Sequence, residues 1–160
     1  MILYHGSNVI VEHPIITNRN KSLDFGLGFY TTLNQEQASV FANRVTRLRN
    51  KGIPTVSIYQ FDEVMAYKEC HLLRFDGANK EWLNFIGNCR KGIPSEEQYD
   101  LVFGPVADDD VIKTTLLYLS GIISLNVAIE QLKVKKLYNQ LVFKTLKSLS
   151  YISFQRSIEV

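Results

Sequence analysis

Short β-prone runs mix irregularly with helical patterns along this chain, and this mixture restricts the fold more than any other feature. No Gly-x-Gly-x-x-Gly lies between a strand and a helix, and no regular strand–helix–strand rhythm is present. A parallel dinucleotide-binding sheet is therefore not expected. The pattern favours an α+β fold with a split, mostly antiparallel β-sheet core and flanking helices. A chain of 160 residues suits one such domain over residues 1–160.

Four segments carry helical signals. The first has apolar residues at three- and four-residue spacings and ends before Gly52 and Pro54; its apolar face is Ala38, Phe41, Ala42, Val45 and Leu48. The others are expected over 79–90, 111–119 (capped by Asp108 to Asp110) and 125–132 (capped by Ser124). Strands are expected at residues 2–4, 29–32, 55–61, 72–75, 101–103, 141–143 and 151–154, and a short one near 15–17.

Charge and cysteine usage exclude several classes of protein. The 18 Lys and Arg residues nearly balance 16 Asp and Glu, which argues against a nucleic-acid coat or a membrane-surface protein. Cys70 and Cys89 are expected to be reduced, partly buried thiols, and no His/Cys cluster suits a structural metal site. The sequence has no signal-peptide pattern and no window of ~18 apolar residues, so a cytoplasmic protein without a membrane span is expected.

Three short segments combine residue types that suit ligand binding. His5 ends a β-prone run and precedes Gly6 and Ser7, so an imidazole lies beside backbone that no side chain covers. Residues 24–32 place two glycines before an aromatic strand, and residues 137–143 begin an apolar strand with Tyr-Asn-Gln. Each segment also has a structural interpretation. Residues 3–7 could be a turn with a solvated histidine, and residues 24–32 an edge strand with core aromatics. Residues 137–143 could be a strand that starts at a turn-forming asparagine.

Taken in this order, the segments resemble the His–Tyr–Glu signature of diphtheria-toxin-type ADP-ribosyltransferases, which include the poly(ADP-ribose) polymerases. The chain is more closely similar to the bacterial domain-of-unknown-function 3990 family. That resemblance rests on Leu-Tyr-His-Gly-Ser at 3–7, Asp-Phe-Gly-x-Gly-Phe-Tyr-Thr-Thr at 24–32, Tyr-Asp-x-Val-x-Gly-Pro-Val-Ala at 99–107 and Tyr-Asn-Gln at 138–140. It covers almost the full length and implies an ADP-ribosyltransferase-like fold that binds NAD as a substrate.

The resemblance implies roles for individual residues, with His5, Tyr30 and Gln140 as the catalytic set. His5 would hydrogen-bond a ribose hydroxyl, and the Gly6 backbone would pair with the nicotinamide carboxamide. Tyr30 and Phe41 would stack on opposite faces of the ring, which contributes about 1 kcal/mol per ring beyond burial. The other expected NAD-contacting residues are Ser7, Gly28, Phe29 and Arg19. For Arg19, which could meet the diphosphate, an exposed loop charge is the equal alternative.

Gln140 is the main departure from the family pattern. The polymerases carry Glu at this position, which grips the ribose 2′-hydroxyl and offers negative charge to the oxocarbenium-like transition state. Gln keeps the hydrogen-bonding shape and loses the charge, so polymer formation is not expected. Asp24 and the run Asp108 to Asp110 could supply a substitute carboxylate, with a loop acid and a helix cap as the alternatives. The hydroxyl that the family uses on the following helix is replaced by Ala38, with Ser39 beside it.

The function implied by the resemblance is NAD-dependent mono-ADP-ribosyl transfer to a protein or nucleic-acid acceptor. Relatives in the bacterial family are often encoded beside a small partner gene, so the enzyme could be the toxin of a toxin–antitoxin pair with a small antitoxin protein as its partner. One alternative is a catalytically silent module that binds NAD or ADP-ribose. Another is an interaction protein in which the pocket is only core. Gln140 keeps both alternatives open.

Overall fold

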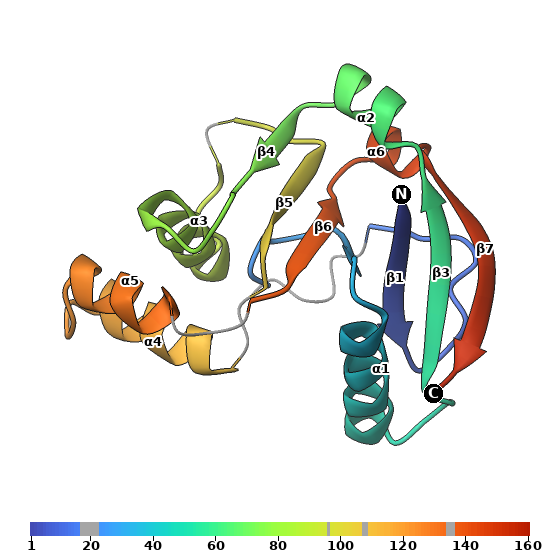
Figure 1. Ribbon diagram of the computed structural model, residues 1–160, viewed down its shortest axis with the longest axis horizontal. Helices are drawn as coiled ribbons and strands as arrows, with labels where there is room; N and C mark the ends of the chain where they lie inside the picture. The colour runs from blue at the N-terminus through green and yellow to red at the C-terminus, as the bar shows by residue number, and fades with distance from the viewer. Residues whose placement is uncertain (17–22, 96, 107–108, 134–136) are drawn as a thin grey trace.

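One seven-stranded sheet organises the computed structural model, which describes residues 1–16, 23–95, 97–106, 109–133 and 137–160. The strand order is β4-β5-β6-β2-β1-β3-β7. The strands are β1 (Ile2–Ser7), β2 (Phe29–Thr32), β3 (Thr55–Phe61), β4 (Leu72–Arg74), β5 (Leu101–Pro105), β6 (Asn139–Phe143) and β7 (Ile152–Glu159). The first strand of the chain therefore lies inside the sheet, between β2 and β3. β2 lies between β1 and β6, which come from opposite ends of the sequence and appear near one another in Figure 1.

The sheet is mixed, which corrects the expectation of a split, mostly antiparallel core. β4 runs parallel to β5, whereas β5–β6, β6–β2, β2–β1, β1–β3 and β3–β7 pair antiparallel. The parallel pair arises because α3 (Lys80–Lys91) connects β4 to β5 as a crossover. All seven strands belong to one continuous sheet. The α+β class is confirmed.

The helices have clear end signals. Besides α3 they are α1 (Gln35–Arg49), α2 (Glu63–Glu69), α4 (Asp109–Leu119), α5 (Leu125–Lys133) and α6 (Leu146–Leu149). Asn34 caps α1 by accepting from Gln37 N–H, and Asn79 caps α3 in the same way by accepting from Trp82 N–H. α1 ends at Asn50, which adopts a left-handed backbone conformation with φ 48°.

Two groups of helices cover one face of the sheet. α1 packs on β1 and β3, and α3, α4 and α5 gather beside β4–β6 (Figure 1). The core under α1 contains Ala38, Ala42, Val56 and Ile58, and the core under α3–α5 contains Phe25, Trp82, Leu83, Ile86, Val102 and Val142 among others. The opposite face of the sheet carries a third cluster around Leu3, Phe29, Tyr59, Phe61, Leu141 and Phe143. The strands β2 and β6 therefore lie where the two helix-covered cores meet.

Most elements were predicted from periodicity, but some details differ. Leu48 and Phe41 are exposed, so only Ala38 and Ala42 of the expected α1 face are buried. β7 is twice the expected length, and neither α2 nor α6 was predicted. No strand forms at residues 15 and 16, and residue 17 lies outside the described residues.

Candidate functional site

The strands β1 and β2 separate beside the predicted His-Gly-Ser segment. Met1 and Phe61 donate backbone hydrogen bonds to each other's carbonyl oxygens, at 2.8 and 2.9 Å. In an antiparallel pair such hydrogen-bonded positions alternate, so the odd-numbered residues of β1 form hydrogen bonds with β3. The backbone N–H and C=O groups of Tyr4 and Gly6 therefore face β2. The register between β1 and β2 contains only Tyr4 opposite Thr32. The Gly6 backbone therefore faces a place where the ladder has ended.

His5 fills part of this separation. Its Nδ1 lies 2.7 Å from the Tyr30 carbonyl oxygen. Because a carbonyl can only accept, Nδ1–H donates and Nε2 keeps its lone pair. Burial lowers the pKa of His5, against the opposing effect of the Tyr30 hydrogen bond, and the charge of Arg49 lowers it further. His5 is thus a neutral imidazole with a free acceptor nitrogen at pH 7.

The neutral state of His5 predicts a pH dependence of stability. The unfolded chain takes up a proton near pH 6.5, but the folded chain does not until lower pH. The contribution of His5 to stability is complete above pH 6.5 and is lost as the pH falls below it. We expect the melting temperature to fall more steeply between pH 7 and pH 5 in the wild type than in His5→Asn. Parallel thermal-melting curves would contradict this assignment.

Gly6 is required for close contact between β1 and α1. A Cβ atom on Gly6 would lie 2.1 Å from the Ala38 carbonyl oxygen and 3.0 Å from Ala42 N. The small side chains of Ala38 and Ala42 complete this contact, and both residues are buried. Ala38, for which the resemblance implied a hydroxyl in related proteins, therefore has a packing role. The neighbouring Ser39 donates to the Gln35 carbonyl within the helix.

The Tyr30 ring is held by the loop that precedes β2. Its hydroxyl donates to the Gly26 carbonyl at 2.6 Å and accepts from Phe25 N–H at 3.1 Å. Burial raises the pKa of Tyr30, so the hydroxyl stays protonated. The ring packs against the core under α3–α5, whereas the His5 ring lies 4.5 Å from the Phe29 ring, which belongs to the core of the opposite face. The structure therefore brings the Tyr30 backbone to His5, and not its phenol ring.

Gln140 lies buried in β6 with one amide group unsatisfied. Its side chain is 6% exposed, and its Nε2 has no hydrogen-bond partner among the described residues. It pairs with Thr32 on one side and with Gly104, which has no side chain, on the other. A buried amide donor without a partner costs about 1–3 kcal/mol unless something supplies an acceptor. This is the clearest sign of a ligand position in the described part of the chain.

The other residues predicted to contact NAD lie in different surroundings. Ser7 and Phe29 are buried, and Gly28 packs so tightly that a Cβ would lie 2.5 Å from Val142 Cγ1. Phe41 is half-exposed on α1, one helical turn after Gln37 and on the same side of the helix. Arg19 lies outside the described residues, so its predicted diphosphate contact is not addressed.

Two of the acidic residues considered as a substitute for Glu at position 140, Asp24 and Asp110, are paired with cations. Asp24 is buried and forms an ion pair with Arg90 of α3, whose Nε donates at 3.0 Å, so it anchors the loop before β2. Asp110 lies 3.6 Å from Lys113 at the exposed start of α4. Asp108 lies outside the described residues.

Two residues of the site were missed by sequence reasoning. Thr32 donates from Oγ1 to Gln37 Oε1 at 2.5 Å, and it accepts from Asn34 N–H at 3.1 Å. Thr32 was named only as the last residue of the 24–32 segment, without a role of its own, and Gln37 was not named. The spacing of a Thr-x-Asn-x-x-Gln segment, with Asn as a cap, was the available signal.

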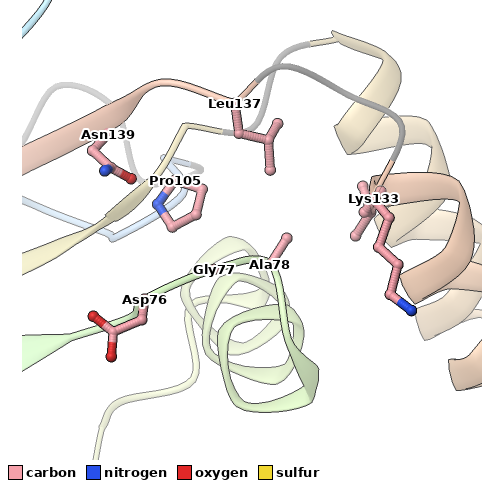
Figure 2. A pocket seen from close by; sticks show the side chains of 8 residues that line it. Asp76, Gly77, Ala78, Pro105, Lys133, Leu137 and Asn139 are labelled. Carbon is pink, nitrogen blue, oxygen red and sulfur yellow. The ribbon is translucent and has the colours of Figure 1, made fainter.

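A separate cavity of about 350 Å³ opens beside the ends of β5 and β6 (Figure 2). It is lined by Asp76, Gly77, Ala78, Pro105, Leu132, Lys133, Leu137 and Asn139. Asp76 and Lys133 lie on opposite sides of it, and Pro105 and Asn139 are the strand residues next to Gly104 and Gln140 (Figure 2). The cavity therefore begins one residue from Gln140, but it includes none of His5, Tyr30 and Gln140 themselves.

Comparison with known proteins shows the family to which the chain belongs. The family described as "Protein of unknown function (DUF3990)" matches residues 1–154. The chain belongs to this family, as its sequence motifs had indicated. No curated protein and no solved structure matches it. Within the described residues no helix is long and apolar enough to span a membrane, and Cys70 and Cys89 are free thiols.

Proposed function

We propose that this chain binds NAD where β1, β2 and β6 meet and transfers single ADP-ribosyl groups to an acceptor. The unsatisfied, buried Nε2 of Gln140 is the observation that carries the proposal. The end of the β1–β2 ladder adds support, because the Gly6 backbone faces the place where the strands separate and His5 Nδ1 reaches the Tyr30 carbonyl across it. The His5 ring itself lies against Phe29, on the opposite face of the sheet from Gln140, so a ligand that contacts both would have to pass between β1 and β2. The sequence motifs resemble those of ADP-ribosyltransferases, and a fold of that type would place the nicotinamide riboside of NAD where β1, β2 and β6 approach one another.

The chemistry requires positioning more than acid–base catalysis. The bond between the ribose C1′ and the nicotinamide nitrogen breaks, and nicotinamide leaves as a neutral molecule. An oxygen or nitrogen of the acceptor forms the new bond to C1′ and loses its proton to solvent. The proposed roles follow: His5 Nε2 accepts from a ribose hydroxyl, the Gly6 backbone pairs with the carboxamide, and the Gln140 amide donates to a ribose oxygen.

The neutral amide of Gln140 limits the rate at which the bond between ribose and nicotinamide would be cleaved. A carboxylate beside the sugar would stabilise the developing positive charge, whereas Gln140 supplies only a dipole. Asp24 does not compensate, because it is paired with Arg90. We therefore expect slow mono-transfer. A silent module that binds NAD or ADP-ribose is the second candidate, and the missing charge at Gln140 is the observation that favours it.

Thermal unfolding with NAD tests the binding step. NAD at 100 times its dissociation constant is expected to stabilise the protein by about 2.7 kcal/mol. For a chain of this size that corresponds to an increase of roughly 5–10 °C in melting temperature. His5→Ala is expected to lose most of this increase. The matched control is His71→Ala, because His71 is exposed and lies at the far end of the sheet beside β4.

The two candidate functions then separate on nicotinamide release. A transferase releases nicotinamide from NAD and labels an acceptor in a cell lysate, and His5→Ala abolishes both. A binding module shows the same thermal shift with no release. An unchanged melting temperature with NAD, nicotinamide and ADP-ribose would eliminate both candidates.

A further inference from the structure

The first turn of α1 places a second carboxamide beside Gln140. Thr32 lies opposite Gln140 on β2, and antiparallel partners point to the same face of the sheet. Thr32 Oγ1 is also 2.5 Å from Gln37 Oε1. Thr32 therefore contacts the side-chain amide of Gln37 on α1 and is the strand partner of Gln140 on β6.

The hydrogen bonds around Thr32 fix which end of Gln37 is available. Thr32 Oγ1 accepts from Asn34 N–H, and its proton has two acceptors within reach, Gln37 Oε1 at 2.5 Å and the Asn139 carbonyl at 3.2 Å. The shorter contact is the one to Gln37. The Gln37 backbone is fixed as well, because its N–H donates to the Asn34 side chain at 2.8 Å. The Nε2 of Gln37 makes no hydrogen bond among the described residues, and it is the end left to face a ligand. Thr32 thus has the Gln37 amide as its hydrogen-bond partner and Gln140 as its strand partner, next to the positive end of the 15-residue α1.

We propose that Gln37 is a ligand-contacting residue that acts with Gln140, with Thr32 as its positioning residue. This inference rests on the proposed NAD site and assigns the sugar of the ligand to the pair. Two N–H donors at the positive end of a helix favour oxygen atoms that carry lone pairs or negative charge, such as ribose oxygens. Phe41 follows Gln37 by one turn on the same side of α1, so its half-exposed ring borders the same space.

A charge substitution at Gln37 separates a ligand contact from a structural role. Gln37→Glu keeps the oxygen that accepts from Thr32, so the local fold is preserved, and it places a carboxylate beside the reacting sugar. Nicotinamide release is expected to rise about 10-fold above the wild type, and the rise is expected to disappear as the carboxylate is protonated below about pH 5. Gln37→Ala is expected to weaken NAD binding about 10-fold.

Gln35→Glu is the matched control, because Gln35 lies in the same turn of α1, is exposed and undergoes the same charge change. It is expected to bind NAD and release nicotinamide at wild-type levels. If the wild type binds NAD and both Gln37 variants behave like Gln35→Glu, the inference about Gln37 is wrong and the proposed function stands. If the wild type does not bind NAD at all, both are overturned. A melting temperature of Gln37→Glu within a few degrees of the wild type confirms that the variants report on the site.

Discussion

Gln140→Glu is expected to raise the rate of nicotinamide release from NAD by about 100-fold, the size of effect typical of one well-placed electrostatic group at a reacting centre. Nε2 of the amide that it replaces has no partner among the residues that the structure describes, so no hydrogen bond to them is lost there. The new carboxylate would lie beside the sugar and close to the N-terminus of α1, whose dipole favours negative charge. Release is measured by chromatography of NAD and nicotinamide over a series of pH values.

Gln140→Glu is also expected to lower the stability of the protein, and this change can be measured alongside the rate. Gln140 is buried, and a buried carboxyl group without a cation has a raised pKa. The rate increase is therefore expected to grow with pH as the glutamate ionises, and the melting temperature without NAD is expected to fall. Gln98→Glu, an exposed change remote from β6, is the control. A lower melting temperature without any gain in nicotinamide release at any pH would argue that Gln140 is only a core residue.

Trp82→Ala is expected to reduce the free energy of unfolding by about 3–5 kcal/mol, the usual range for removing a large buried aromatic side chain. Trp82 is fully buried in the core under α3–α5 and donates from its indole nitrogen to the Pro105 carbonyl at 3.1 Å. The substitution therefore leaves a cavity and an unsatisfied carbonyl at the end of β5, next to the strand that carries Gln140. Chemical denaturation by urea measures the change.

Trp82→Phe separates the two contributions. It keeps most of the buried ring and loses only the indole N–H, so about 1–3 kcal/mol is expected. Trp82→Ala is also expected to weaken NAD binding, because the position of β5 and β6 depends on this contact. Equal losses for the two variants would show that the hydrogen bond, and not the ring volume, sets the position of β5.

The elements of the fold followed from local patterns because those patterns reflect local physics. The capping asparagines, the three- and four-residue apolar spacing of α3 and the β-branched run of β3 each report on interactions within a few residues. β7 was cut short because only Ile152 and Phe154 alternate clearly, whereas the pairing with β3 continues through Arg156 and Ile158 after a bulge. That continuation depends on a partner strand and leaves little trace in the local sequence.

The candidate site was predictable in part. His5, Gly6, Tyr30 and Gln140 were named from their motifs, and their strands are adjacent in the sheet. Gln37 and Thr32 were missed because their importance comes from a contact between a strand and a helix. Phe41 was expected on the apolar face of α1 and is half-exposed, whereas Ala38 and Ala42 are the buried residues of this helix and lie against Gly6.

The sequence by itself determined most of the longer strands and helices and the family to which the chain belongs, since both depend on the order and spacing of neighbouring side chains. Only the tertiary structure decided that α3 joins β4 and β5 in parallel, that Asp24 is paired with Arg90, and that Gln140 Nε2 has no hydrogen-bond partner in the described part of the chain. Each of these depends on atoms that are distant in the chain and are brought within hydrogen-bonding or packing distance only when the sheet has assembled.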